Sequence, residues 1–112
     1  MHRAVKDRIE VALPTRFRAL GKSGSGEIKN VSPGGMFIST RATFEVGDKI
    51  DVSFREPWGD PIEAHGVVWW ITKDVQFYGM PIQGFGVRLA DAGQSYQRLL
   101  ARLQKKGRSA RK

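Results

Sequence analysis

Large apolar residues alternate with other residues in several short segments of the first ninety positions, which is the pattern of half-buried β-strands. Between residues 9 and 13 every second residue is large and apolar, and after Pro14 the alternation resumes with Phe17 and runs toward Gly21. Successive side chains of a strand point to opposite faces, so one face of this segment is apolar. We predict a strand here, with a break at Pro14.

The following residues divide into further short strand-like segments that are separated by turn residues. Strands are predicted at about residues 27–31, 36–40, 50–54, 62–72 and 84–90, separated by the sequences GKSGSG, SPGG, VGD and PWGDP and by a loop from Lys73 to Gln83. Parallel strands would need helical crossovers, and no helical pattern lies between these segments. The sequence therefore predicts an all-β antiparallel barrel or sandwich.

One helix is expected near the C-terminal end of the chain. Tyr96, Leu99, Leu100 and Leu103 follow the spacing i, i+3, i+4, i+7, which places them in one stripe along a helix. Such a stripe is typical of an amphipathic helix that lies on a hydrophobic core. We predict that these four residues attach the helix to the β-structure.

Two apolar features could serve either packing or binding. Trp69 and Trp70 are neighbours in a predicted strand, so they face opposite sides and at most one enters the core easily; the other packs under the helix or is available to a partner. The predicted loop after them is unusually apolar. Its large side chains either form a lid over the barrel end or a docking surface for a partner protein, and they are Phe77, Tyr78, Met80 and Ile82.

The composition excludes several kinds of site. A chain of 112 residues without cysteine has about one domain, no disulfides, no thiolate metal site and no cysteine nucleophile. Two histidines without an acidic cluster of ligand spacing predict no catalytic centre, no metal site and no cofactor. No run approaches the roughly 18 apolar residues that a membrane span needs, so a cytoplasmic protein is expected.

The net charge of +8 raises the possibility of nucleic-acid binding, but it is unevenly distributed. Residues 101–112 carry six Lys or Arg and no acid, whereas residues 41–100 carry six Lys or Arg against eight acids. Most of the excess therefore lies in an end segment that can be solvated without contacting anything. We predict a basic, disordered tail at residues 104–112.

The segment KNVSPGGMFIST places polar side chains beside a pair of glycines. In an extended strand Asn30 and Ser32 point to one face and Val31 to the other. Asn and Ser are also common turn residues that bond their own backbone, so the pair alone leaves a structural and a binding role open. Asn30, Ser32 and Gly35 spell N-x-S-x-x-G, and at this point the chain resembles the PilZ domain family.

The resemblance covers about residues 3–103, because further segments look like those of the family in the same order: GGMFIST, VGDKIDVSF, GVVWW and GFGVRLA. It implies a six- to seven-stranded antiparallel PilZ-type β-barrel with one C-terminal α-helix. The expected organisation is a flexible N-terminal arm at residues 1–8, the barrel and helix at residues 9–103, and the tail at residues 104–112.

The family binds the bacterial second messenger cyclic di-GMP through this motif and a pair of arginines that precedes the first strand. The resemblance implies that Arg8 contacts phosphate and guanine, and that Arg3 is a second cation. Asn30 and Ser32 would offer hydrogen bonds, while Gly35 would permit a sharp turn and keep the approach clear. The family spaces its arginines as R-x-x-x-R, whereas this sequence has Ala4 at the expected partner position.

Three functional hypotheses follow. The first is a non-enzymatic receptor that binds cyclic di-GMP and relays the signal to a partner protein. The second is an adaptor of the same fold that does not bind cyclic di-GMP and acts through protein contacts, for example in motility control. The third, which rests on charge alone, is a small nucleic-acid-binding module; no specific nucleic acid and no membrane insertion are expected.

Overall fold

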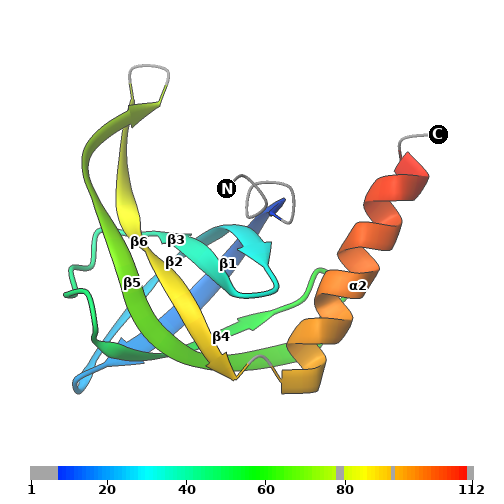
Figure 1. The fold of residues 1–112 in the computed structure, drawn as a ribbon, viewed down its shortest axis with the longest axis horizontal. Coiled ribbons are helices and arrows are strands. Elements are labelled where there is room, and N and C mark those ends of the chain that lie inside the picture. The colour runs from blue at the N-terminus through cyan, green and yellow to red at the C-terminus, as the bar shows by residue number, and fades with distance from the viewer. Residues whose placement is uncertain (1–7, 78–79, 92, 111–112) are drawn as a thin grey trace.

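The computed structural model describes the backbone of residues 8–77, 80–91 and 93–110, and the side chains of residues 8–72, 83–90 and 93–104. These ranges hold six strands and one helix (Figure 1). In chain order the elements are β1 (Ile9–Ala19), β2 (Lys22–Ser32), β3 (Gly35–Ser39), β4 (Lys49–Arg55), β5 (Pro61–Phe77), β6 (Met80–Asp91) and α2 (Gly93–Ala110).

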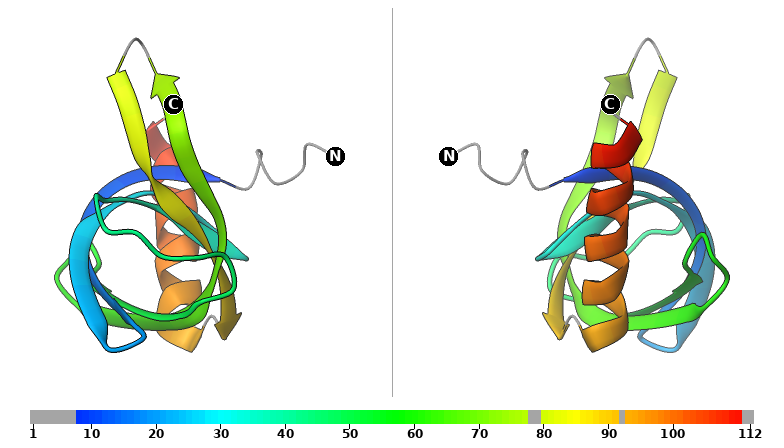
Figure 2. Two further views of the ribbon diagram at one scale, coloured as in Figure 1. Left: turned by 90° about the vertical axis from the view of Figure 1, so that its left-hand side faces the viewer. Right: turned by 90° about the vertical axis from the view of Figure 1, so that its right-hand side faces the viewer.

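The six strands close into a barrel in the order β1-β2-β3-β6-β5-β4. Every neighbouring pair is antiparallel, including β1 with β4, which closes the ring. The helix follows β6, and Figure 2 shows it behind the barrel in one view and in front of it in the opposite view. This confirms the predicted all-β antiparallel barrel with one C-terminal helix.

The barrel interior is filled by the inward-facing residues of the alternating pattern. In β4 every second residue is buried, and Ile50 and Val52 are each 1% exposed. Three aromatic rings meet edge to face, with centroids 5.4–5.8 Å apart, and belong to Phe17, Phe44 and Phe85. This geometry is favourable because the positive edge of one ring meets the negative face of another. The alternation in the sequence thus marks the residues that form the core.

The predicted break in the first strand is displaced from its expected position. β1 continues through Pro14, and the irregularity precedes it, because pairing with β2 shifts register between Glu10 and Leu13. Pairing of β1 with β4 spans Thr15 to Arg18. Pro14 therefore has a partner strand on one side only, where the lack of an N–H donor is tolerated.

The loop predicted from Lys73 to Gln83 is largely a hairpin extension, so this prediction is wrong. β5 continues to Phe77 and β6 begins at Met80, and the two strands project together beyond the barrel (Figure 1). Their ladder pairs the backbone groups of the two strands, which strand pairing achieves without apolar alternation in the sequence. The side chains of the proposed partner surface, Phe77, Tyr78, Met80 and Ile82, lie outside the described residues.

The helical stripe of the sequence is confirmed, since Tyr96 and Leu99 are fully buried and Leu100 is 7% exposed. Leu103 is partly buried against the same core. The helix does not end there, because α2 continues to Ala110, into the basic segment that the sequence places outside the helix. Within the described residues, no helix is long and apolar enough to cross a membrane.

A second contact holds α2 to the turn between β4 and β5. The Arg102 guanidinium lies over the Trp58 ring, 4.0 Å from its centroid. The same guanidinium is 3.7 Å from a carboxylate oxygen of Glu56, whose side chain is 5% exposed. A cation over an indole face is attractive, so this contact adds to the apolar packing of the helix.

Candidate functional site

The motif residues lie on the β2–β3 hairpin in the arrangement that the sequence predicts. Val31 is fully buried in the core, whereas Asn30 and Ser32 are half-buried on the opposite face. Ser32 pairs with Gly35 across the turn. The two polar side chains therefore share one face of the hairpin beside the glycine.

A cavity of about 220 Å³ brings this face together with the start of β1 and with the strands β5 and β6. Arg8, which directly precedes β1, lines it together with Asn30, Ser32 and Gly35. Four of the five predicted ligand residues thus meet in one place. The fifth, Arg3, lies outside the described residues.

Gly35 is required for space and not for an unusual backbone angle. A Cβ at this position would lie 2.1 Å from the carbonyl oxygen of Val87 in β6, a distance that no side chain tolerates. Gly35 does not have a positive φ. The sharp-turn role that the sequence predicted therefore does not explain why glycine is needed here. Gly35 instead allows β3 and β6 to pair closely at the edge of the cavity.

The backbone of the motif turn is held by the helix. The buried hydroxyl of Tyr96 donates to the carbonyl oxygens of Ser32 and Gly35, at 2.7 and 3.0 Å. The Ser32 hydroxyl also donates to the carbonyl of Gly35, at 3.3 Å, so the turn-residue role left open by the sequence is present. Burial raises the pKa of Tyr96 well above its ordinary value, which keeps the phenol protonated as a donor.

Both tryptophans lie outside the core, so the packing alternative predicted for them is wrong, and the alternative of a side chain available to a partner remains. Trp69 is 54% exposed and Trp70 is 42% exposed, and both line the cavity. The register shifts between them and β6, because Val68 pairs with Val87 and Trp70 pairs with Gly86. A bulge of this kind leaves Trp69 unpaired and breaks the simple alternation of faces.

Each tryptophan has a defined neighbour. The Trp70 ring stacks on Phe37 with centroids 5.2 Å apart and an interplanar angle of 18°. A Cβ at Gly86 would lie 2.2 Å from the Trp70 ring nitrogen, so glycine is needed at that position to accommodate the indole. The Arg88 guanidinium lies over the Trp69 ring, 4.6 Å from its centroid.

Sequence reasoning missed the contribution of Trp69, Trp70 and Arg88 to this cavity. The available signal was the neighbouring tryptophans in GVVWW and the arginine in GFGVRLA, two segments predicted to be strands. Nothing in that pattern says that these strands are adjacent or which way their side chains point. The pairing of β5 with β6 brings them together.

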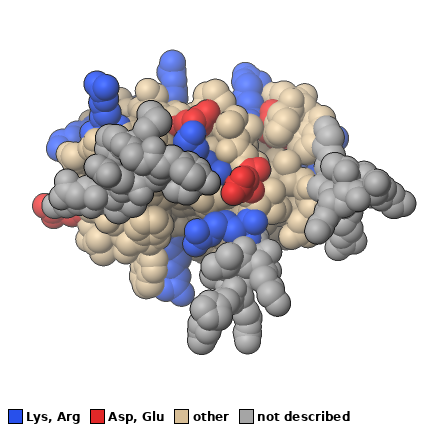
Figure 3. All heavy atoms as spheres, turned by 90° about the horizontal axis from the view of Figure 1, so that it is seen from above, with Lys and Arg blue, Asp and Glu red and all other residues tan. Residues whose placement is uncertain are grey.

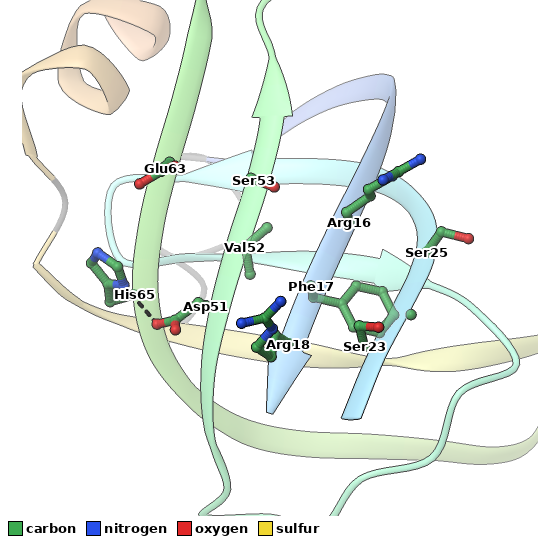
Figure 4. A pocket seen from close by; sticks show the side chains of 11 residues that line it. Arg16, Phe17, Arg18, Ser23, Ser25, Asp51, Val52, Ser53, Glu63 and His65 are labelled. Atoms are coloured by element: carbon green, nitrogen blue, oxygen red, sulfur yellow. Dashed lines mark hydrogen bonds and ion pairs between the residues drawn. The ribbon is translucent and has the colours of Figure 1, made fainter. Parts of the chain in front are cut away.

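The charge of the cavity distinguishes it from a larger hollow. Arg8 and Arg88 line the cavity, and none of the described Asp or Glu residues does. The larger hollow, of about 630 Å³, is lined by Arg16 and Arg18 but also by two carboxylates (Figure 4). Of these two sites, only the smaller offers an anion arginines without a carboxylate among the described lining residues.

The larger hollow lies over β1, β2, β4 and β5, and two of its lining side chains, Asp51 and His65, contact each other. A carboxylate oxygen of Asp51 lies 2.7 Å from the Nδ1 atom of His65, and both side chains are more than half exposed. Glu63 supplies the second carboxylate (Figure 4). Within the described part of the chain, no three His, Asp or Glu side chains are grouped as metal ligands.

Basic residues do not form a continuous patch on the face seen in Figure 3. Acidic side chains lie among the Lys and Arg side chains there. Lys and Arg clustered on one face are the usual electrostatic footprint of nucleic-acid binding. This face therefore gives no support to the nucleic-acid hypothesis.

Comparison with solved structures shows the same fold at low sequence identity. The inhibitor of motility MotI/DgrA from Bacillus subtilis superposes with a TM-score of 0.79 at 18% identity over 94% of this chain, which spans 51% of that structure. The PilZ domain of YcgR from Escherichia coli, solved with cyclic di-GMP, gives 0.67 at 14% identity, covering 92% of both chains. The PilZ domain of CeSA from a cellulose-synthesizing bacterium gives 0.56 at 16%, covering 86% of this chain and 92% of that one.

A search of curated protein sequences gave no match. The family profile described as the PilZ domain matches residues 2–105, which is nearly the whole chain. The match includes the motif hairpin, every strand of the barrel and the part of α2 that packs on the core. The chain therefore belongs to the PilZ domain family.

Proposed function

We propose that this protein is a non-catalytic receptor that binds cyclic di-GMP and relays the signal to a partner protein. The observation that carries the proposal is the convergence of Arg8, Asn30, Ser32 and Gly35 on one cavity that no Asp or Glu in the described part of the chain lines. The ligand carries two phosphates and two guanines, so its site must supply positive charge and hydrogen-bonding groups. The cavity offers both.

Each motif residue has a role that fits its chemistry. Arg8 is exposed and can donate two parallel hydrogen bonds to a phosphate or to a guanine edge. The Asn30 amide both donates and accepts, which suits a base edge. Ser32 supplies a hydroxyl, and because this group already donates to Gly35, it would receive a hydrogen bond from the ligand.

The N-terminal arm completes the site in this proposal. A volume of about 220 Å³ is smaller than the roughly 300–1,000 Å³ of most small-molecule sites, so the described residues contact only part of the ligand. We assign the remaining contacts to residues 1–8, with Arg3 as the second cation. Ordering of this arm around the ligand is the conformational switch, because ligand contacts favour the ordered state over the free one.

The helix provides a route from the site to a partner. Tyr96 of α2 donates to the backbone of Ser32 and Gly35, the two ends of the motif turn. A ligand that shifts this turn changes the two hydrogen bonds that the Tyr96 hydroxyl donates to it, and with them the position of α2 on the barrel. A partner that contacts the helix or the arm can then distinguish the bound state from the free state.

The related structures support this proposal without deciding it. The Escherichia coli domain is described with cyclic di-GMP, and the Bacillus subtilis protein is described as an inhibitor of motility. At 14–18% identity these likenesses establish the fold, and they make a ligand and a protein partner reasonable expectations.

Isothermal titration calorimetry with cyclic di-GMP tests the proposal. We expect wild-type binding that Arg8→Ala weakens by at least about tenfold, because a charged hydrogen bond contributes about 1.5–3 kcal/mol. Ser32→Ala should weaken it less, since the lost contact is neutral. Arg16→Ala is the matched control, because this exposed arginine does not line the cavity that holds the motif residues and should leave the affinity unchanged. The absence of heat at high micromolar ligand would contradict the receptor function.

The adaptor function is the second candidate, and the replacement of an expected arginine by Ala4 favours it. Loss of one charged hydrogen bond lowers affinity about 10- to 150-fold, enough to remove a micromolar site from the physiological range. In that case the protein acts through a surface such as the one formed by Phe77, Tyr78, Met80 and Ile82. A chain that binds a partner equally with and without cyclic di-GMP would fit this function.

A further inference from the structure

Arg88 and Trp69 form a pair at the edge of the cavity that the family motif does not include. Arg88 belongs to β6 and Trp69 to β5, and the guanidinium carbon lies 4.6 Å from the centroid of the indole ring. Both residues line the cavity with Asn30 and Ser32. The pair is therefore part of the same site, on the side formed by β5 and β6.

The position of Arg88 relative to the motif follows from strand pairing. Arg88 pairs with Gly35 across the β3–β6 ladder and with Val67 across the β5–β6 ladder. Gly35 adds no side chain at this pair, and both residues line the cavity. The closeness of the two backbones, which would place a Cβ of Gly35 at 2.1 Å from the Val87 carbonyl, keeps Arg88 directly beside the turn.

The hydrogen-bonding groups of Arg88 are available. Among the described residues no carboxylate forms an ion pair with it, and its side chain is exposed. Contact with an indole face holds a guanidinium through the ring electrons and leaves its N–H groups free to donate. An arginine that is positioned but not neutralised is suited to bind an anion or a pair of acceptors.

We infer that Arg88 recognises a guanine base of the bound dinucleotide and selects it against adenine, with Trp69 as the residue that positions Arg88. This inference rests on the proposed function. The O6 and N7 atoms of guanine are adjacent acceptors that match the two parallel donors of a guanidinium. Adenine presents a donor in place of O6, so the same arginine meets one acceptor and one repelling N–H group.

Trp69 positions Arg88 and also offers an exposed ring surface on which a base can stack. Its indole is 54% exposed although it lies beside the cavity, so ring area remains available next to Arg88. Bases stack on aromatic faces with little dependence on their identity. Trp69 therefore adds affinity for either base, whereas the arginine supplies the discrimination.

The test compares cyclic di-GMP with cyclic di-AMP in calorimetric titrations of the full chain. The wild type should prefer cyclic di-GMP. Arg88→Lys keeps the positive charge but loses the two parallel N–H donors, so it should weaken cyclic di-GMP binding about 5- to 150-fold. The same variant should change cyclic di-AMP binding much less, so the ratio of the two affinities falls. Arg98→Lys, an exposed arginine of α2 that does not line the cavity, is the matched control.

Tryptophan fluorescence tests the role of Trp69 separately. Cyclic di-GMP should quench the wild-type emission. Trp69→Phe should reduce this change, with the remainder coming from Trp70, which also lines the cavity, while Trp58→Phe, in the Arg102 contact, should retain it. Trp69→Ala should reduce the preference for guanine and Trp69→Phe should largely restore it, because a phenyl ring can still hold the guanidinium. A purely structural role would lower both affinities equally and leave the ratio unchanged.

The outcomes separate this inference from the function on which it rests. A wild type that binds neither dinucleotide overturns the proposed function and the guanine contact with it. A wild type that binds cyclic di-GMP with an affinity ratio that Arg88→Lys leaves unchanged overturns the guanine contact alone. Loss of binding in Arg8→Ala together with an unchanged ratio in Arg88→Lys would place the recognition of guanine on the motif side only.

Discussion

Tyr96→Phe removes a single hydroxyl at the junction between the helix and the motif turn. The tyrosine is fully buried, and its hydroxyl lies 2.7 Å from the Ser32 carbonyl oxygen and 3.0 Å from that of Gly35. The phenylalanine ring fills nearly the same space, so packing of α2 on the barrel is preserved. The substitution therefore isolates the hydrogen bonds from the apolar contacts.

The expected loss of stability follows from the burial of these groups. One donor serves two carbonyl oxygens. Its removal takes the Tyr96 hydrogen bond from the Ser32 carbonyl, whereas the Gly35 carbonyl keeps the hydrogen bond from the Ser32 hydroxyl. Leaving a buried acceptor unsatisfied costs about 1–3 kcal/mol. For a domain of this size the melting temperature should then fall by about 4–12 °C.

Urea denaturation followed by circular dichroism measures this loss, and Thr15→Val is the matched control. Thr15 is 4% exposed and donates from its hydroxyl to the Ser53 carbonyl at 3.0 Å, away from the cavity. Both variants should lose similar stability, whereas only Tyr96→Phe should also weaken cyclic di-GMP binding, because only Tyr96 holds the motif turn. A change in unfolding free energy below about 0.5 kcal/mol would refute the assignment. Equal ligand affinity in both variants would refute the link between the helix and the site.

Three further predictions concern the same region. Gly35→Ala should destabilise the fold by about 1–3 kcal/mol in urea denaturation with or without ligand, because its Cβ would lie 2.1 Å from the Val87 carbonyl; Gly34→Ala, whose Cβ would meet nothing within 4 Å, should not. Ala4→Arg, which restores the R-x-x-x-R spacing, should tighten or create cyclic di-GMP binding in calorimetry, and an affinity equal to that of the parent would refute the spacing argument. Burial raises the pKa of Tyr96 in the folded state, so the unfolded chain ionises first. The wild type should accordingly lose stability as pH rises above about 10, and Tyr96→Phe should show a smaller loss between neutral and alkaline pH.

The sequence alone determined the fold class and the identity of the motif. Alternation in β4 marked Ile50 and Val52 for the core, and the stripe through Tyr96 and Leu99 marked the face of α2 that packs on it. Asn30 and Ser32 were placed on one face by the same reasoning, and they line one cavity. These features depend on the period of a strand or a helix, which is a local property of the chain.

Only the tertiary structure decided which strands meet at the site and in what register. The sequence could not place Arg88 beside Gly35, because their pairing joins segments more than fifty residues apart. The bulge that turns both Trp69 and Trp70 outward depends on how β5 matches β6. The reason for glycine at position 35 is likewise the closeness of β6 and not the turn in which it lies. Cross-strand register is set by the whole barrel, so contacts that depend on it are not encoded in any short stretch of sequence.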